Sequence, residues 1–407
     1  MSSAWQEQYL AINKKILHRL ESSVSQVESD FTYASGLPGQ MMAMVCLAEH
    51  DENYQLDRDL IEDGLCRMLS ALPKLGLGLF QGSTGLMFCA LEIERHLDFG
   101  LVEDAAYDYD VFVLDCLKHE QNLPHHFDLI SGISGLTVYA VYRAQQTGSK
   151  ELLQACIARL EKMSTKNEVG THWFTPPDWI RGFPMGEMNP LGCIDLGLAH
   201  GQPGVLAALA YAIASGQDTR ASTIAMLKDG LRTLRHYDLN HELGHFASAA
   251  GHGGSSRCAW CYGDFGAASA LRLSAQALRE PGLDEWANRI LAHMSRREVE
   301  TLGFVDAWMC HGSAGSAWIM RQLSREHDNA AFEYERLHLI DGMCSIEYSL
   351  AHDNDLGLGI LEGCAGAALT FAERLGKVNV LHWSLPFLAG RSALRDLSLV
   401  PESLVVA

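Results

Sequence analysis

The sequence predicts an all-α fold, in which about seven buried helices alternate with about seven more polar helices around a closed ring. Three observations support this prediction. A Gly-x-x-Gly pair recurs seven times, an apolar run follows each pair, and a polar segment with helical spacing separates successive runs. An open superhelical array of the same helices is the alternative that these observations leave.

The glycine pairs recur at a regular interval. Their first members are Gly36, Gly82, Gly132, Gly201, Gly263, Gly312 and Gly363. Successive first glycines are 46, 50, 69, 62, 49 and 51 residues apart, which is long enough for two helices and their connections. Glycine adopts left-handed backbone angles and lets neighbouring segments approach closely, so we expect each pair to mark the entry to a helix.

The segments around the pairs differ in polarity. Residues 40–45, 86–91 and 205–210 are almost uncharged runs directly after a pair, and a helix that is apolar on all sides is a buried helix. In residues 57–72 and 150–162, apolar side chains recur every three or four positions beside charged ones. We therefore expect buried helices after the pairs and outer helices between them.

Length and composition indicate one domain over residues 1–407, since no Pro/Gly/Ser-rich linker divides the chain. The long intervals within residues 165–190 and 237–257 have room for small insertions. A net charge of −19 argues against a nucleic-acid partner. The longest apolar stretch, residues 191–215, contains Asp195, His200 and Pro203 and is a poor membrane span.

Cysteine usage indicates a reducing compartment. The chain has 11 cysteines without the spacing of a disulfide scaffold, and its N-terminus lacks the basic-then-apolar pattern of a signal peptide. We therefore expect a cytoplasmic protein in which most thiols fill the core.

Five polar residues stand just before glycine pairs: Asp128, His200, Cys261, Cys310 and His311. If the pairs mark equivalent turns of a ring, these side chains meet at one end of it. Two thiols and an imidazole form a ligand set for Zn²⁺, and three protein ligands leave the fourth position for a reactant. The sequence therefore predicts a reactive zinc site.

Other interpretations of the same residues remain open. Cys258 forms Cys-x-x-Cys with Cys261, which allows a closed structural site with Cys310 and His311, or a redox pair. A second candidate metal site is a histidine cluster in a glycine-rich segment, made of His236, His241, His245 and His252. Taken alone, Asp128 is also compatible with a helix N-cap, and His200 with a hydrogen-bonded core histidine. The reactive site is favoured because it uses equivalent repeat positions.

Four motifs carry a resemblance to a known family. They are Pro-Leu-Gly-Cys at residues 190–193, Gly-Leu-Ala-His-Gly at 197–201, Ala-Trp-Cys-Tyr-Gly at 259–263 and Cys-His-Gly at 310–312. With all seven glycine pairs in order, the chain resembles the LanC-type lanthionine synthetases, the stand-alone cyclases of lantibiotic biosynthesis. The resemblance implies a double α/α toroid of seven inner and seven outer helices.

The resemblance also implies roles for residues. Zinc ligands would be Cys261, Cys310 and His311, and the other functional residues would be His200, Asp128, Arg257 and Tyr262. One departure is Cys258, which occupies a position that is often acidic in relatives.

The implied reaction joins a cysteine of a dehydrated precursor peptide to a dehydroalanine or dehydrobutyrine of the same peptide, forming a lanthionine or methyllanthionine thioether. Two thiolate ligands would make zinc electron-rich enough to hold a reactive thiolate. Arg257 suits the oxygen of the enolate that addition produces, and His200 with Asp128 suits the proton transfers.

Partners implied by the resemblance are the leader-bearing precursor peptide, a dehydratase and an ABC exporter. These partners would place a cytoplasmic chain at the inner face of the membrane. Two alternatives share features with this reading. One is a LanC-like protein that binds glutathione or another small thiol. The other is a zinc prenyltransferase-type toroid, against which the seven-fold rhythm counts.

Overall fold

The computed structural model describes residues 3–26, 30–120, 122–241, 244–253, 257–324, 328–353, 356–377, 380–390 and 393. Its contacts divide the chain into two compact units. Unit 1 comprises Met1–Leu123, Phe304–Trp318 and Glu333–Trp383, and unit 2 comprises Pro124–Gly303, Ile319–Phe332 and Ser384–Ala407. Each unit is built from segments that are separate in sequence, and the single domain expected over residues 1–407 stays a prediction.

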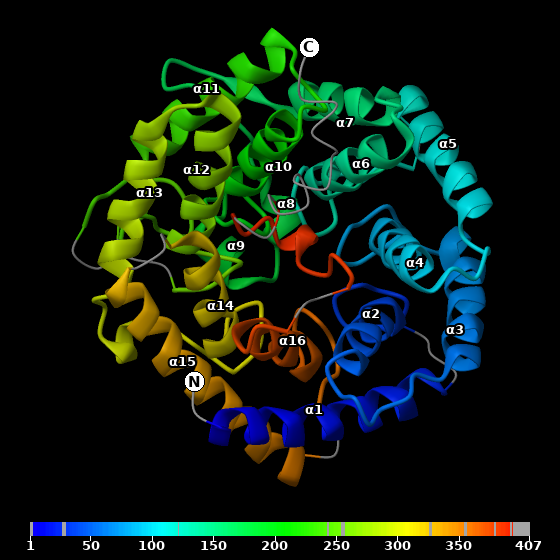
Figure 1. Cartoon of the computed structure of the whole chain (residues 1–407). Helices are drawn as coiled ribbons and strands as arrows, with labels where there is room; N and C mark the ends of the chain where they lie inside the picture. Colours follow the sequence, from blue (N-terminus) through cyan, green and yellow to red (C-terminus); the bar gives the residue numbers. More distant parts are fainter. Residues whose placement is uncertain are drawn as a thin grey trace. The chain divides into compact units, whose positions relative to one another are not determined.

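Each of the seven first glycines directly precedes a helix. These helices, labelled in Figure 1, are α2 (Leu37–Ala48), α4 (Ser83–Leu97), α6 (Ile133–Thr147), α10 (Gln202–Ala214), α12 (Asp264–Leu278), α14 (Ser313–Leu323) and α16 (Cys364–Arg374). All residues of α2 are buried, and so are all residues of α10 except Ala214. The predicted buried helices are therefore confirmed, and they begin where the glycine pairs place them.

Close approach is the main reason for glycine in these turns. Gly36, Gly82, Gly132 and Gly201 have φ of −92°, −156°, −111° and −124°, which are angles open to any residue. A Cβ on Gly201 would overlap the backbone of Asp195, and one on Gly204 would overlap the carbonyl oxygen of Leu198. The expected left-handed angles occur at Gly263, with φ of 98°, and at no other first glycine.

Seven further helices are amphipathic or longer and more polar. They are α1 (Ser3–Val24), α3 (Arg58–Ala71), α5 (Glu103–His119), α7 (Glu151–Met163), α11 (Ala221–His236), α13 (Pro281–Met294) and α15 (Asn329–His352). In α3, the Asp57 carboxylate accepts the N–H groups of Asp59 and Leu60 at 3.1 and 3.2 Å, and so caps the first turn. Helices α3 and α7 thus confirm the prediction of outer helices over residues 57–72 and 150–162.

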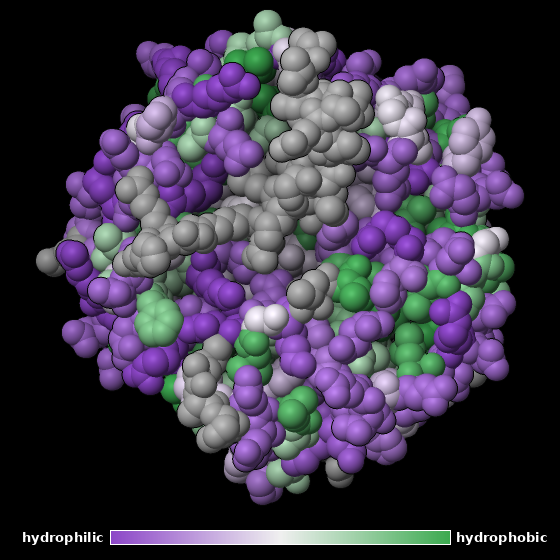
Figure 2. Space-filling view, in the orientation of Figure 1, coloured by the Kyte–Doolittle hydropathy of each residue, from purple (hydrophilic) through white to green (hydrophobic). Residues whose placement is uncertain are grey.

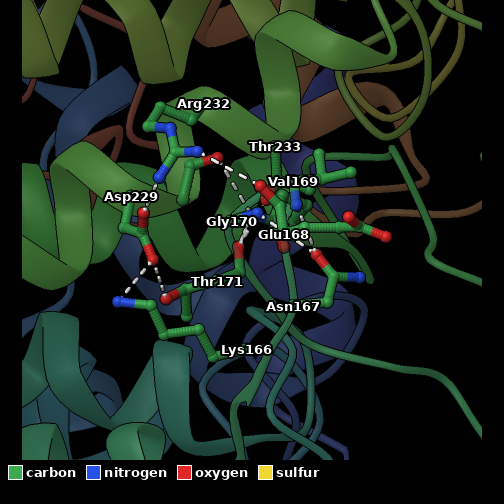
Figure 3. Close-up of polar contacts among 11 residues, drawn as sticks. Lys166, Asn167, Glu168, Val169, Gly170, Thr171, Asp229, Arg232 and Thr233 are labelled. Atoms are coloured by element: carbon green, nitrogen blue, oxygen red, sulfur yellow. Dashed lines mark hydrogen bonds and ion pairs between the residues drawn. The ribbon is translucent and has the colours of Figure 1, made fainter.

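A segment of short strands, short helices and loops separates α7 from the next long helix. It contains the antiparallel strands β1 (Thr165–Lys166) and β2 (Thr171–His172) and the short helices α8 (Pro177–Ile180) and α9 (Pro184–Met188). Asp229 of α11 holds this hairpin, since it accepts Thr171 Oγ1 at 2.8 Å and Lys166 Nζ at 3.1 Å (Figure 3). Arg232 extends the attachment by pairing with the same carboxylate at 2.6 Å.

The second expected insertion, residues 237–257, is described in part, because residues 242–243 and 254–256 lie outside the described ranges. Its described portion forms isolated bridges, including one between Asp195 and Ala249. Whether either segment is an insertion stays a prediction.

The face drawn in Figure 2 is mainly hydrophilic, with hydrophobic side chains in small groups. Across the described ranges, every helix is either too short or too polar to span a bilayer.

Candidate active site

Backbone hydrogen bonds connect the turns that precede the buried helices of unit 2. The Leu129 N–H donates to the carbonyl oxygen of Ala199 at 3.0 Å, and the Ala199 N–H donates to that of Cys261 at 3.2 Å. The turns before α6, α10 and α12 therefore lie side by side, although the bonded residues are 70 and 62 positions apart in sequence. Asp128, His200 and Cys261 belong to these three turns.

Unit 1 repeats the same connection. The Cys310 N–H donates to the Leu361 oxygen, the Leu361 N–H to the Ala34 oxygen, and the Ala34 N–H to the Phe80 oxygen, each at 3.0 Å. All four residues stand two positions before the first glycine of a pair, as Cys261 does in unit 2. Cys261 and Cys310 thus occupy the same position of two different repeats.

An imidazole and a carboxylate are paired in unit 2. His200 Nδ1 lies 2.7 Å from Asp128 Oδ2, while Asp128 Oδ1 accepts the Ser131 N–H at 2.9 Å. Asp128 is buried and the His200 side chain is 47% exposed. Burial disfavours the imidazolium, but the hydrogen bond and charge of Asp128 outweigh that effect, so the pKa of His200 is raised. A half-exposed ring with a raised pKa suits proton exchange with a bound molecule.

Tyr262 is held by a second carboxylate of unit 2. Its hydroxyl donates to Asp195 Oδ2 at 2.7 Å, and its ring centroid lies 6.4 Å from that of His200. Burial raises the pKa of Asp195 to about 6 and raises that of Tyr262. The phenol therefore stays protonated and acts as a donor near His200.

Short helices and loops of unit 2 pack beside these residues. Trp179 of α8 contacts the His126 ring, with centroids 4.4 Å apart, and Tyr262 packs against a small buried cluster of Ile180, Met185, Cys193 and Ala249. The segment between α7 and α10 therefore supports the turn of Asp128 and the ring of Tyr262.

Within the described part of the chain, one group of side chains could hold a metal ion: Cys261, Cys310 and His311. Their ligand atoms all lie within 4.8 Å of one another. Two soft sulfur donors and one imidazole nitrogen are ligand types that Zn²⁺ prefers.

Among the described residues, neither alternative metal site of the sequence analysis forms a metal-capable group, and a redox role of the Cys258–Cys261 pair stays a prediction. Cys258 is buried, its pKa is raised to about 12 by burial, and it does not belong to the metal-capable group. His245 pairs with Asp238 at 2.8 Å, and His252 contacts Asn189 at 2.7 Å. These contacts are those of structural histidines.

Arg257 is exposed, and its backbone and Cβ lie against Gly303. Among the residues described, no hydrogen bond or ion pair fixes its guanidinium. The role of Arg257 at an enolate oxygen stays a prediction.

Two carboxylates beside the candidate residues were not predicted from the sequence. Asp195 meets Tyr262, and Asp306 Oδ2 lies 3.1 Å from His311 Nε2. Each stands six positions before the first glycine of its pair, as Asp30 does in the first repeat. Aligning the repeats on their glycines would have revealed this recurring aspartate.

Comparison with known proteins agrees with these features. Residues 27–386 match the family described as lanthionine synthetase C-like protein. The chain belongs to the lanthionine synthetase C-like family. It is 25% identical over 386 residues to the nisin biosynthesis protein NisC of Lactococcus lactis subsp. lactis, covering 87% of this chain and 88% of that protein.

Solved structures give the fold. The nisin cyclase structure superposes with a TM-score of 0.77 at 22% identity, covering 94% of this chain and 98% of the cyclase. The predicted fold class, an all-α helical toroid, is confirmed by this match and by the helical content. Family and relatives together establish a lanthionine cyclase of the LanC type.

Proposed function

We propose that this LanC-type cyclase is zinc-dependent, and that it adds cysteine thiolates to dehydroalanine or dehydrobutyrine residues of one dehydrated precursor peptide. The main support is the convergence of Cys261, Cys310 and His311, whose ligand atoms lie within 4.8 Å. The relative NisC carries the name of nisin biosynthesis, which supports a lanthipeptide substrate. The products would be lanthionine and methyllanthionine rings.

Cys261, Cys310 and His311 would hold Zn²⁺, and bound zinc would favour the thiolate form of a substrate cysteine. Two thiolates and a neutral imidazole make the ligand set electron-rich. Sulfur held by such a set keeps more nucleophilicity than it would beside neutral ligands.

His200 and Asp128 would carry out the proton transfers of this addition. The thiol proton must leave before the C–S bond forms, and the α carbon must gain a proton when the C=C bond becomes single, so no net oxidation occurs. His200 Nδ1 faces Asp128 at 2.7 Å, which leaves Nε2 as the nitrogen that exchanges protons with the peptide. The Arg257 guanidinium would supply a donor to the enolate oxygen. Tyr262, whose hydroxyl donates to Asp195, would line the site beside His200.

The precursor would be bound through its leader, and a dehydratase and an ABC exporter would be its neighbours in a membrane-associated complex. These partners are those that the resemblance to the LanC-type synthetases implies.

The test combines metal analysis with a cyclisation assay on a dehydrated precursor. His200→Ala should keep stoichiometric zinc and lose cyclisation, because its side chain is not a ligand. Cys310→Ala should lose zinc. The matched control is Cys258→Ala, which changes a nearby buried thiol and should keep zinc. Thiol-alkylating reagents should label the peptide less after each ring closes.

Full activity of His200→Ala, or stoichiometric zinc in Cys310→Ala, would contradict the proposed assignment.

A further inference from the structure

Three repeats carry an aspartate six positions before the first glycine: Asp30, Asp195 and Asp306. In each, Oδ1 accepts the N–H two residues later, at 2.8 Å in Asp30, 2.7 Å in Asp195 and 2.8 Å in Asp306. The backbone oxygen of each accepts the N–H of the residue after the glycine, at 2.9, 2.8 and 3.1 Å. The same turn is therefore built three times.

The first glycine completes this turn, because a Cβ there would overlap the aspartate. At Gly36, Gly201 and Gly312 the overlap would include Oδ1 itself. The carboxylate is thus held on one edge by a backbone N–H and packed against glycine. Because the turn fixes Oδ1, it also fixes the orientation of the second oxygen, Oδ2.

In two of the repeats, Oδ2 meets a residue of the candidate active site. Asp195 Oδ2 accepts the Tyr262 hydroxyl at 2.7 Å. Asp306 Oδ2 lies 3.1 Å from Nε2 of His311, five residues later, and both side chains are about one-fifth exposed, at 22% and 20%. In these two repeats, one oxygen of the carboxylate stabilises the turn and the other contacts a side chain of the candidate active site.

We infer that Asp306 is a positioning residue for the metal ligand His311. A ring nitrogen serves one partner at a time, so the Nε2–Asp306 contact assigns Nδ1 to the metal. A carboxylate on the distal nitrogen keeps the proton there, fixes the ring orientation and raises the basicity of the ligating nitrogen. This inference rests on the proposed zinc site, and it adds a residue that holds His311 ready for it.

Asp306→Asn is the sharpest test, because it keeps the size of the side chain and the oxygen that caps the turn. With Oδ1 on the Trp308 N–H, the new amide NH₂ faces Nε2. Two donors then oppose each other, which moves the imidazole proton onto Nδ1, the nitrogen that the metal needs. Zinc affinity, measured by competition with a chelating dye, should fall about 10–100-fold.

Asp30→Asn is the matched control, since Asp30 makes the same turn but Ser35, not a histidine, precedes its glycine. Its zinc affinity should equal that of the wild type. Thermal unfolding of the metal-free proteins shows whether the variants fold. If Asp306→Asn does not fold, Asp306→Ser provides the second variant, because its hydroxyl can accept the turn N–H but offers no Oδ2.

Wild-type zinc affinity in a folded Asp306 variant would overturn the inference alone. Absence of stoichiometric zinc from the wild type would overturn the proposed metal site, and this inference with it. Weaker binding in Asp30→Asn equal to that in Asp306→Asn would show that the turn, and not the contact with His311, is responsible.

Discussion

Replacing Asp128 with asparagine should inactivate His200 without removing it. Asp128 Oδ1 accepts the Ser131 N–H at 2.9 Å, and Oδ2 accepts from His200 Nδ1 at 2.7 Å. Asparagine can keep its oxygen on the Ser131 N–H, but its NH₂ group then faces Nδ1. The favoured tautomer carries its proton on Nε2, where it can no longer accept one from the substrate.

The expected loss is that of a general acid–base, about 10²- to 10⁴-fold in the rate of cyclisation. The pH profile should shift as well. Asp128 raises the pKa of His200, so the neutral, basic form appears only as the pH rises through that raised value. Without the carboxylate charge the pKa of His200 falls. The rise of the cyclisation rate with pH should therefore occur at lower pH, and the maximum rate should be lower.

The assay follows ring formation by mass spectrometry after thiol alkylation, at several pH values, with zinc content measured in parallel. Asp238→Asn is the matched control, because Asp238 pairs with His245 at 2.8 Å in the same unit but outside the candidate site. Asp238→Asn should retain the profile of the wild type. An Asp128→Asn variant with the rate and pH profile of the wild type would refute a proton-transfer role for the pair.

Three further outcomes are expected. Glu92 is buried, but hydrogen bonds from His382 and Arg95 outweigh burial and lower its pKa from 4.5 to about 2. Its ionised form should therefore contribute about 3 kcal/mol of stability at neutral pH that is lost as the pH falls from 4.5 towards 2. The difference in the free energy of urea unfolding between wild type and Glu92→Gln should accordingly be smaller at pH 3 than at pH 7. An equal difference at the two pH values would contradict this prediction. Gly204→Ala should destabilise the protein by about 1–3 kcal/mol in thermal unfolding, because its Cβ would overlap the Leu198 oxygen. The control Gly282→Ala, whose Cβ would enter open space, should keep the stability of the wild type within about 1 kcal/mol. Tyr262→Phe removes the donor to Asp195 and raises the already elevated pKa of that carboxyl further. It should therefore lower the free energy of unfolding by about 1–3 kcal/mol at pH 8 and by less at pH 5. A loss of stability that is the same at both pH values would exclude this cause.

Much of the fold could be predicted because its determinants are local. Apolar runs after each glycine pair, such as residues 205–210, predict buried helices without knowledge of the rest of the fold. The prediction of left-handed glycine angles was wrong at all first glycines but Gly263. Backbone angle and close approach both favour glycine, and a sequence does not distinguish them.

The sequence by itself determined the repeat, the alternation of buried and outer helices, and the positions Cys261, Cys310 and His311 as candidate metal ligands. Tertiary structure alone decided that Asp195 serves Tyr262, 67 positions away. It also gave Asp128 and His200, which the sequence analysis had placed at one site, a direct contact across 72 positions. Such pairings depend on turns that meet through backbone hydrogen bonds, and no local preference of either residue encodes its distant partner.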